Sequence, residues 1–351
     1  MKNTLYCGMD FHKKDTELCV MDGEGTILEQ VRVPSAKLVQ FLSNRKEYHI
    51  GIESSGGVMD MATRLEEVGH KVTVINPSQF QGIGITGKKN DKNDAKALAT
   101  ALRLGFVPEV YKKTLYARQV KSLLVSRDLV VRLRISVTNH IRGILREYGV
   151  VMSAGAESFW KESSQKVEKL ECPIMKDVLK GLLTEATNLK DQEVSIEESL
   201  KQLTINDERI ERLQTVPGVG MVTAAAYVAT IDDVTRFADA RKVGSYLGLT
   251  PRENSSGNKV RFGSITKCGP ELVRRYLIHG ARAVFRYKET PKNKIRMWAS
   301  KVEKRAGANK AVVAVAHKNA RIMYSMLMNG TNFGEMKKAQ KEEKIAQDFA
   351  A

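Results

Sequence analysis

The sequence predicts a mixed α/β domain at the N-terminus, followed by two mainly helical regions. Two observations carry this prediction: strand-like and helix-like runs alternate over the first hundred residues, and apolar residues at helical spacing dominate from residue 115 onward. With 351 residues, of which 42% are hydrophobic and 28% charged, the chain exceeds one comfortable hydrophobic core and has the composition of a folded protein. We therefore expect several ordered domains.

The first strands should form an antiparallel meander, because Asp22–Gly25 between two of them is typical of a hairpin turn. The expected elements are strands over residues 4–9, 16–21 and 26–33, a helix over 36–42, a strand over 48–53, a helix after Gly57 and a strand over 71–75. Three strands in hairpin order, followed by helix, strand, helix and strand, is the order of a ribonuclease-H-like sheet.

Helical patterns follow this sheet. One helix is expected over 115–148, and apolar residues then recur every seven positions at Leu189, Ile196, Leu203 and Ile210. Such a heptad indicates a helical hairpin or coiled coil, most simply a spacer that also dimerises, or else a helix packed on its own domain. The expected boundaries are 1–150 for the α/β domain, 151–212 for the helical or coiled-coil linker, 213–335 for a second domain and 336–351 for a charged tail.

The second domain opens with a glycine-rich turn. Residues 215–226, with Gly218 and Gly220, have the form of a helix-hairpin-helix turn, whose glycines let backbone N–H groups approach a phosphate at a helix N-terminus. A plain connection between two helices has a similar sequence. The two glycines are therefore candidate nucleic-acid contacts, with a purely structural turn as the alternative.

The chain is strongly basic, with 57 Lys and Arg against 40 Asp and Glu and a net charge of +17. Between Arg241 and Lys310 lie 18 basic and 4 acidic residues, so most of the excess charge belongs to one stretch. Charge concentrated in this way indicates a polyanionic partner such as nucleic acid, and a merely soluble basic surface is the alternative.

Several other classes are excluded by the sequence pattern. No run of about 18 apolar residues and no signal-peptide pattern occurs, which predicts a cytoplasmic protein without a membrane partner. The four cysteines lack the spacing of a disulfide framework or of a zinc site.

Four acidic residues are placed to converge. Asp10 and Glu53 end two strands that should be adjacent and parallel, and Asp91 and Asp94 lie three residues apart at an expected helix start. Converging carboxylates repel one another without cations, and their oxygen ligands suit Mg²⁺ or Mn²⁺, the metals of phosphodiester chemistry. Taken singly, each residue has a simpler explanation as a surface or helix-capping residue. An actin-like or sugar-kinase ATPase needs a Gly/Thr-rich phosphate loop after the first Asp, and residues 11–14 provide none.

A candidate nucleophile lies in a turn-rich loop of the basic stretch. Ser256 is followed by Gly257, which allows tight backbone geometry beside an exposed hydroxyl. A serine hydroxyl is a weak nucleophile until a base or metal activates it. An ordinary turn exposed to solvent is the alternative explanation of this sequence. The loop also carries charges that could hold a phosphate, namely Arg252, Lys259, Arg261 and Lys267.

Eight short motifs occur in the order of a known family. They are Gly8–Asp10, Ile52–Gly56, Val74–Pro77, Asp91–Ala95, Pro217–Gly220, Gly248–Pro251, Ser256–Gly257 and Ile265–Lys267. On these motifs the chain, from residue 4 to residue 330, resembles the DEDD-type insertion-sequence transposases. These are the Piv/MooV-like recombinases of the insertion-sequence one-ten (IS110) family, which are bridge-RNA-guided.

The resemblance implies a RuvC-like N-terminal domain, a coiled-coil linker and a C-terminal transposase domain, assembled as a dimer to tetramer on donor and target DNA. It implies that the four acidic residues bind the metal and that Ser256 joins covalently to DNA at a site shared with another subunit. A noncoding bridge RNA from the element would supply the choice of sequence. Ser255 directly precedes Ser256, so the identity of the nucleophilic hydroxyl stays open, and Cys268 stands where the family often has Arg or a small residue.

Two other functions fit the same residues. A RuvC-like junction nuclease would hydrolyse DNA with water and would need no serine. A nucleic-acid-binding protein without catalysis would need neither the carboxylates nor a metal. Because a basic stretch explains binding in every case, affinity alone does not separate the three.

Overall fold

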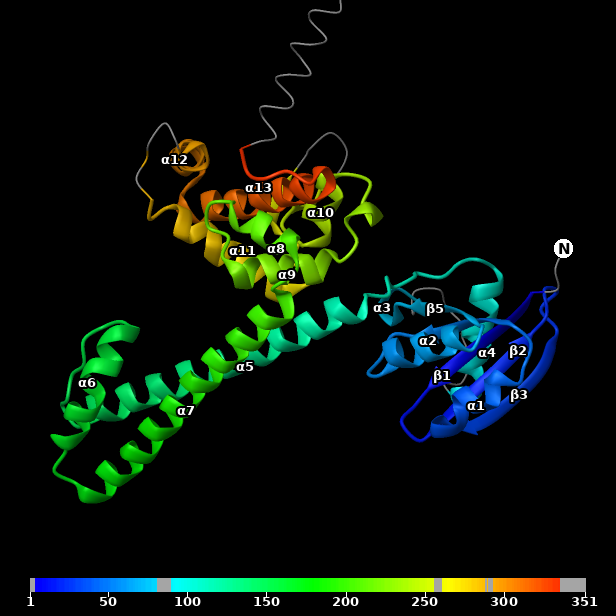
Figure 1. Cartoon of the computed structure of the whole chain (residues 1–351), viewed down its shortest axis with the longest axis horizontal. Helices are drawn as coiled ribbons and strands as arrows, with labels where there is room; N and C mark the ends of the chain where they lie inside the picture. Colours follow the sequence, from blue (N-terminus) through cyan, green and yellow to red (C-terminus); the bar gives the residue numbers. More distant parts are fainter. Residues whose placement is uncertain (1–3, 81–89, 256–260, 288, 290–292, 335–351) are drawn as a thin grey trace, which may run out of the picture. The chain divides into compact units, whose positions relative to one another are not determined.

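A computed structural model describes residues 4–80, 90–255, 261–287, 289 and 293–334. The chain divides into two compact units, the α/β unit Met1–Lys113 and the helical unit Thr114–Ala351 (Figure 1). The expected boundary at residue 150 differs from this division, because the long helix that starts at Leu115 packs against helices of the second unit. Within the described ranges, no helix combines the length and the apolar character needed to cross a membrane.

The α/β unit is built on a five-stranded sheet in the order β3-β2-β1-β4-β5 (Figure 1). Its strands are β1 Leu5–Phe11, β2 Asp15–Met21, β3 Ile27–Pro34, β4 Tyr48–Glu53 and β5 Lys71–Ile75. β1, β2 and β3 pair antiparallel, whereas β4 is parallel to both β1 and β5. The five expected strands are thereby confirmed. The turn between β2 and β3 is closed by Asp22, whose Oδ1 accepts the N–H groups of Glu24 and Thr26.

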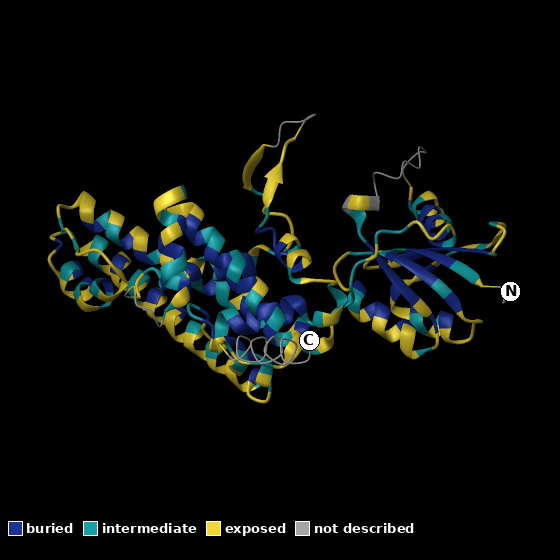
Figure 2. Cartoon of the chain, turned by 90° about the horizontal axis from the view of Figure 1, so that it is seen from above, coloured by how far each residue is buried: buried dark blue, intermediate teal, exposed yellow. Residues whose placement is uncertain are grey.

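Helices cover both faces of the sheet. They are η1 Ser35–Lys37, α1 Leu38–Ser43, α2 Val58–Glu67, α3 Pro77–Phe80 and α4 Asp91–Arg103. α1 and α2 pack on one face over Met9 and Ile52, which are fully buried. α4 packs on the opposite face against Cys19 and Met21 of β2. Both faces are therefore largely buried at the inner strands, which appear dark blue in Figure 2, whereas most residues of the edge strand β3 are at least partly exposed.

Glycines in the strands let α4 lie unusually close to the sheet. A Cβ atom on Gly8 of β1 would lie 1.8 Å from the carbonyl oxygen of Ala95 in α4, so no larger residue fits there without moving the helix. At Gly51 of β4 the space is also narrow, with the Leu102 side chain 3.3 Å from an ideal Cβ. The close approach fixes α4 above the middle of the sheet.

The helical unit begins with two long helices that pack side by side. α5 (Leu115–Glu147) runs outward and α7 (Pro173–Thr204) returns along it, and α6 (Ala156–Glu168) covers their far end (Figure 1). Ion pairs tie the two helices together, because Arg127 and Arg134 both contact Glu193 of α7 at 3.0 and 2.9 Å. The structure thus shows a helical hairpin within one chain.

The seven-residue repeat does not continue along a single helix. α7 ends at Thr204, and Asp207 caps a new helix, so Ile210 belongs to α8 (Glu208–Gln214) and is buried in the core of the unit. Leu189 is buried, whereas Ile196 and Leu203 are partly exposed. The first three members of the repeat thus lie on α7, which forms a helical hairpin with α5, as one of the expected alternatives has it, and a helix break separates Ile210 from them.

The rest of the helical unit forms one large core. The elements in this part of the chain are α8, α9 Met221–Ile231, η3 Val234–Arg236, α10 Ala240–Tyr246, β6 Pro251–Glu253, β7 Phe262–Ile265, α11 Glu271–Val284, α12 Lys294–Ala306 and α13 Ala308–Asn329. α9 is apolar on all sides and lies at the centre. The Tyr227 hydroxyl on α9 is fully buried and donates to the Ala320 carbonyl oxygen at 2.7 Å. The C-terminal region is mainly helical, as expected.

The glycine-rich turn between α8 and α9 packs against α11. Gly218 has φ +82°, and a Cβ atom there would lie 2.3 Å from the carbonyl oxygen of Gly280. The Asn319 side chain donates to the carbonyl oxygen of Pro217 at 3.0 Å. Gly218 thus faces protein, and its lack of a side chain is explained by packing. Gly220 differs, because it is exposed at the N-cap of α9.

Candidate functional site

Two of the acidic residues stand at adjacent strand ends on the face that α4 covers. β1 and β4 pair in parallel up to Met9 and Ile52, and Asp10 and Glu53 are the next residue on each strand. Side chains alternate between the faces of a sheet, so Asp10 lies on the same face as Gly8 and opposite to the buried Met9. The same alternation places Glu53 on the face of Gly51.

The other two acidic residues lie in the first turn of α4. The side chain of Asn90 accepts the N–H group of Asn93 at 2.8 Å and so begins the helix immediately before Asp91. Asp91 and Asp94 follow within this turn, at the helix end where a negative charge is favoured. The Gly8 contact with α4 brings this turn over the end of β1.

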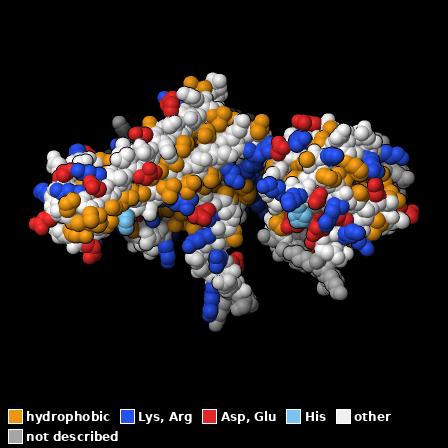
Figure 3. Space-filling view, turned by 90° about the horizontal axis from the view of Figure 1, so that it is seen from below, with side chains coloured by type: hydrophobic (Ala, Val, Ile, Leu, Met, Phe, Trp, Pro, Cys, Tyr) orange, Lys and Arg blue, Asp and Glu red, His pale blue; other side chains and the backbone are white. Residues whose placement is uncertain are grey.

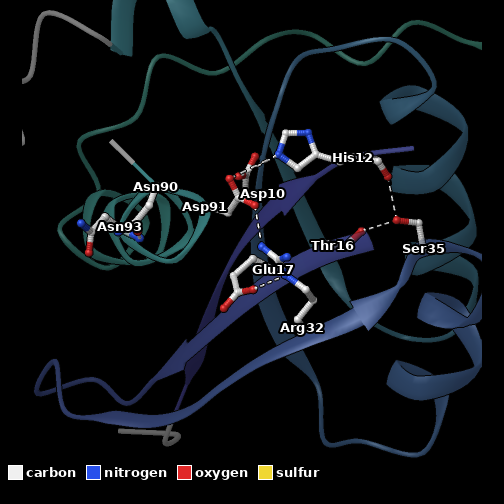
Figure 4. A network of polar contacts seen from close by, with 9 residues as sticks. All are labelled: Asp10, His12, Thr16, Glu17, Arg32, Ser35, Asn90, Asp91 and Asn93. Carbon is white, nitrogen blue, oxygen red and sulfur yellow. Dashed lines mark hydrogen bonds and ion pairs between the residues drawn. The ribbon is translucent and has the colours of Figure 1, made fainter. Parts of the chain in front are cut away.

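A histidine joins the carboxylates. His12 Nε2 lies 3.1 Å from Asp10 Oδ2 and 4.0 Å from Asp91 Oδ1 (Figure 4). The backbone at His12 is held by Ser35, whose hydroxyl donates to the His12 carbonyl oxygen at 2.7 Å and contacts Thr16 at 2.8 Å. One ligand atom each from Asp10, His12 and Asp91 lie within 4.8 Å of one another.

Basic side chains surround this group. Arg32 of β3 contacts Glu17 of β2 and Asp91 at the same time (Figure 4). On the face of the α/β unit shown in the space-filling view, acidic side chains gather beside a histidine with Lys and Arg around them (Figure 3). The positively charged side chains around the carboxylates therefore offset part of the repulsion between them.

The ionisation of Asp10 reflects these surroundings. Partial burial is the main cause that raises its pKa above the ordinary value, and the negative charges of Asp91 and Asp94 raise the pKa further. His12 acts in the opposite direction, through its charge and its hydrogen bond. Asp94 is thus close enough to act on Asp10 although it lies outside the group of three.

The donor set fits one divalent cation. Two carboxylates and an imidazole offer oxygen and nitrogen ligands of the kind that Mg²⁺ or Mn²⁺ accepts, and the nitrogen favours Mn²⁺ over Mg²⁺. Among the described residues, Glu53 and Asp94 do not belong to this close group. Glu53 ends the neighbouring strand, and Asp94 lies three residues further along α4. The structure therefore brings Asp10 and Asp91 together and leaves the other two carboxylates beside them.

The serine loop is an exposed β-hairpin of the helical unit. β6 pairs antiparallel with β7, and nearly all of their residues are exposed. The Ser255 hydroxyl donates to Glu253 Oε1 at 2.7 Å and accepts the N–H group of Arg261 at 3.3 Å. Three residues singled out in the sequence, Ser256, Gly257 and Lys259, lie outside the described residues.

The basic residues of this loop are placed differently from one another. Arg252 donates to the carbonyl oxygen of Thr266 at 3.2 Å, so its guanidinium lies along the hairpin. Lys267 follows β7 with φ +56°, a left-handed conformation that is rare for residues other than glycine. Arg252, Arg261 and Lys267 are all partly or fully open to solvent.

Sequence reasoning missed His12, Glu17 and Arg32. His12 had a signal, since it follows Asp10 by two residues and so lies at the same sheet edge. Arg32 and Glu17 had no such signal, because counting residues back from the turn between their strands does not place them opposite each other. The β2–β3 ladder shifts register between Val20 and Met21, and only this bulge places Glu17 opposite Arg32.

Comparisons with known proteins agree along most of the chain. Residues 7–150 match the DEDD transposase model of IS110, described as a transposase, and residues 210–296 match the model described as Transposase IS116/IS110/IS902 family. The chain is 35% identical over 332 residues to the transposase for insertion sequence element IS1111A of Coxiella burnetii, covering 93% of this chain and 90% of that protein.

Two further relatives match over similar lengths. A probable family 20 transposase of Pseudomonas aeruginosa is 30% identical, with 94% of this chain and 98% of that protein covered. The transposase for insertion sequence element IS1328 of Yersinia enterocolitica is 29% identical, with 95% and 100% covered. On these matches the chain belongs to the IS116/IS110/IS902 family of insertion-sequence transposases.

Proposed function

We propose that this transposase cuts and rejoins DNA with a divalent-metal site on the α/β unit and the hydroxyl of Ser256 as nucleophile. The observation that carries the proposal is the placement of Asp10 and Glu53 at adjacent strand ends, beneath the helix turn that bears Asp91 and Asp94. The strand order of the sheet supports a RuvC-like, ribonuclease-H-like assignment of this unit.

Asp10 and Asp91 would hold the metal together with His12, and Glu53 and Asp94 would complete its surroundings. When bound, Mg²⁺ or Mn²⁺ supplies positive charge that stabilises the scissile phosphate. The serine oxygen attacks the phosphorus, and the bond from the phosphorus to the leaving strand oxygen breaks. The serine gives up its proton to solvent, and the leaving oxygen takes up a proton from solvent and departs as an alcohol. Because the new bond is a phosphodiester, a strand end can attack it in turn and restore the serine without ATP.

The contacts of Ser255 favour Ser256 as the nucleophile. The Ser255 hydroxyl already makes two hydrogen bonds that close the hairpin, to Glu253 and to the backbone of Arg261. A hydroxyl used in this way is a structural group. The proposal therefore assigns the attack to its neighbour and phosphate contacts to Arg252, Lys259, Arg261 and Lys267.

The proposed partners are donor DNA, target DNA, an element-encoded bridge RNA and further copies of the chain. The net charge of +17 supports binding of polyanions, and the role of the RNA is carried over from the resemblance in sequence. Val125, Leu129 and Leu133 lie four residues apart on α5 and are each nearly half exposed, which supports a contact between copies through the helical hairpin. Hydrophobic side chains are visible on the helical part in Figure 3.

Oligomer formation is tested by light scattering of the full chain. Leu129→Glu should shift the protein toward smaller species, because a charge would then be buried at the contact. Leu104→Glu, at an exposed leucine of the α/β unit, is the control. An unchanged mass for Leu129→Glu would remove the hairpin from the contact.

The metal site is tested by cleavage of a labelled donor-end DNA in the presence of Mg²⁺ and the flanking RNA. Glu53→Gln should reduce cutting by at least about 10³-fold, since metal stabilisation of the transition state is worth several kcal/mol, while DNA binding is retained. Glu67→Gln, an exposed acid on α2, serves as the control. Unchanged cutting in Glu53→Gln would overturn the acidic site.

The same assay separates the two rival functions. A junction nuclease that uses water would cut normally after Ser256→Ala. A protein that only binds nucleic acid would show no metal-dependent cutting in any variant. The proposal predicts cutting that requires both the carboxylates and the serine.

A further inference from the structure

A second row of charged residues crosses the sheet next to the acidic site. In the pairing of β1 with β2, Asp10 lies opposite Glu17, and in the pairing of β2 with β3, Glu17 lies opposite Arg32. The three side chains therefore share the face that α4 covers. Glu17 and Arg32 are assigned no role in the proposed reaction.

Glu17 is an unusual residue for its position. Its side chain is only 1% exposed, and Oε1 has no hydrogen-bond partner among the described residues. Its other oxygen, Oε2, accepts the Nε–H group of Arg32 at 3.1 Å. A buried carboxylate is costly unless a cation accompanies it, so Glu17 holds the Arg32 guanidinium in one place.

The held guanidinium reaches the acidic site. Arg32 Nη2 donates to Asp91 Oδ2 at 2.6 Å, and the second oxygen, Oδ1, is the one that faces His12 (Figure 4). A carboxylate with one oxygen fixed in this way presents the other in a defined direction. Ligands of metal ions are commonly oriented by such a hydrogen-bonded partner.

The contact is not needed to attach α4 to the sheet. Gln30, two residues before Arg32 on β3, donates to the carbonyl oxygen of Lys92 at 2.9 Å and so holds the same helix turn by its backbone. Gly8 fixes the helix at its next turn through Ala95. The Arg32 contact acts on the Asp91 side chain itself.

We infer that Arg32, anchored by Glu17, is a positioning residue that turns Asp91 Oδ1 toward Asp10 and thereby shapes the metal site. The inference rests on the proposed metal-binding function of Asp10 and Asp91. A different role for Arg32, simple neutralisation of negative charge, predicts unchanged metal affinity when the net charge of the pair is kept and higher affinity when the positive charge alone is removed. Removal of a neutralising cation would make the site more negative and would tighten metal binding.

The experiment measures Mn²⁺ binding to the full-length protein by calorimetry. Arg32→Lys keeps the charge but loses the planar fork that reaches Glu17 and Asp91 together. The double variant Glu17→Gln with Arg32→Gln replaces the ion pair by two neutral amides, so that no unpaired buried charge is left. Arg45→Gln removes another arginine of the same unit, which pairs with Glu29 at 2.8 Å, and is the matched control. Thermal unfolding confirms that each variant is folded.

We expect the dissociation constant for Mn²⁺ to rise about 10-fold or more in Arg32→Lys and in the double variant, the range seen when outer partners of metal ligands are removed. Arg45→Gln should bind as the wild type does. Unchanged or tighter binding in both Arg32 variants would overturn the inference while the metal site stands. Absence of Mn²⁺ binding to the wild type, or equal binding to Asp10→Asn, would overturn the metal site and the inference with it.

Discussion

The carboxylates of the α/β unit stand on buried secondary structure, whereas the hairpin that leads to Ser256 is exposed along both of its strands. Asp10 lies near the end of β1, directly after the fully buried Met9, and Asp91 begins a helix that is pressed against Gly8. Glu253 and Ser255, in contrast, hold the hairpin together by bonds within the hairpin itself.

This difference in burial suits the two proposed roles, metal binding and nucleophilic attack. Metal ligands must keep fixed mutual distances, which rigid elements provide. A nucleophile that has to reach a phosphate on a separate molecule benefits from an exposed arm, as functional groups on loops commonly do. The proposed function accordingly takes its metal ligands from the buried elements of the first region and its nucleophile from the loop of the second.

The largest effect should come from filling the contact between β1 and α4. Gly8→Val would place side-chain atoms against the Ala95 carbonyl oxygen, so the variant should lose about 3 kcal/mol of stability and its metal-dependent cutting. Gly23→Ala is the control, because Gly23 lies in the turn between β2 and β3, where an added Cβ would have no atom within 4 Å. Chemical denaturation measures both, and equal stability of the two variants would show that the helix can move away from the sheet.

A smaller effect is expected from the charges of the hairpin. Arg252→Ala should weaken DNA binding to the same extent for all sequences and should lower the slope of log affinity against log salt by about 1, since one phosphate contact is lost. Lys161→Ala on α6 removes an exposed lysine that pairs with Glu157, and should leave the slope unchanged. Titration of DNA binding at several salt concentrations decides the point, and equal slopes for Arg252→Ala and the wild type would remove this residue from the interface.

The smallest effect concerns the stability of the hairpin. Ser255→Ala removes two hydrogen bonds that are open to solvent, so the free energy of unfolding should change by less than about 0.5 kcal/mol. The same denaturation experiment measures the change. A loss similar to that of Gly8→Val would mean that the hairpin is part of the folded core and would erase the contrast between the two regions.

Much of the α/β unit could be predicted from the sequence, because strands with apolar runs and a polar turn have strong local signals. The positions of Asp10 and Glu53 at strand ends followed from the same patterns. Asp91 was found because Asn90 and the two following acids have the composition of a helix start. These features depend on residues close together in the chain.

The rest depends on contacts between distant residues. Arg32 meets Glu17 only because a bulge between Val20 and Met21 shifts the strand register by one residue, and counting back from the turn would place Arg32 on the wrong face. The partner of the apolar stripe on α7 proved to be α5 of the same chain, which a heptad alone does not reveal. Gly218 looked like a phosphate contact by its motif, and its packing against Gly280 became visible only in three dimensions.

The central claim is that a metal site and a serine act together, and a covalent adduct tests it most directly. Purified protein, Mg²⁺, the flanking RNA and a labelled donor-end DNA are incubated and resolved on a denaturing gel for the wild type, Ser255→Ala, Ser256→Ala and Glu53→Gln. The account predicts a protein–DNA adduct with the wild type and Ser255→Ala, and none with Ser256→Ala or Glu53→Gln. Cleavage without any adduct, equally strong after Ser256→Ala, would contradict it and would identify a metal-dependent nuclease that uses water.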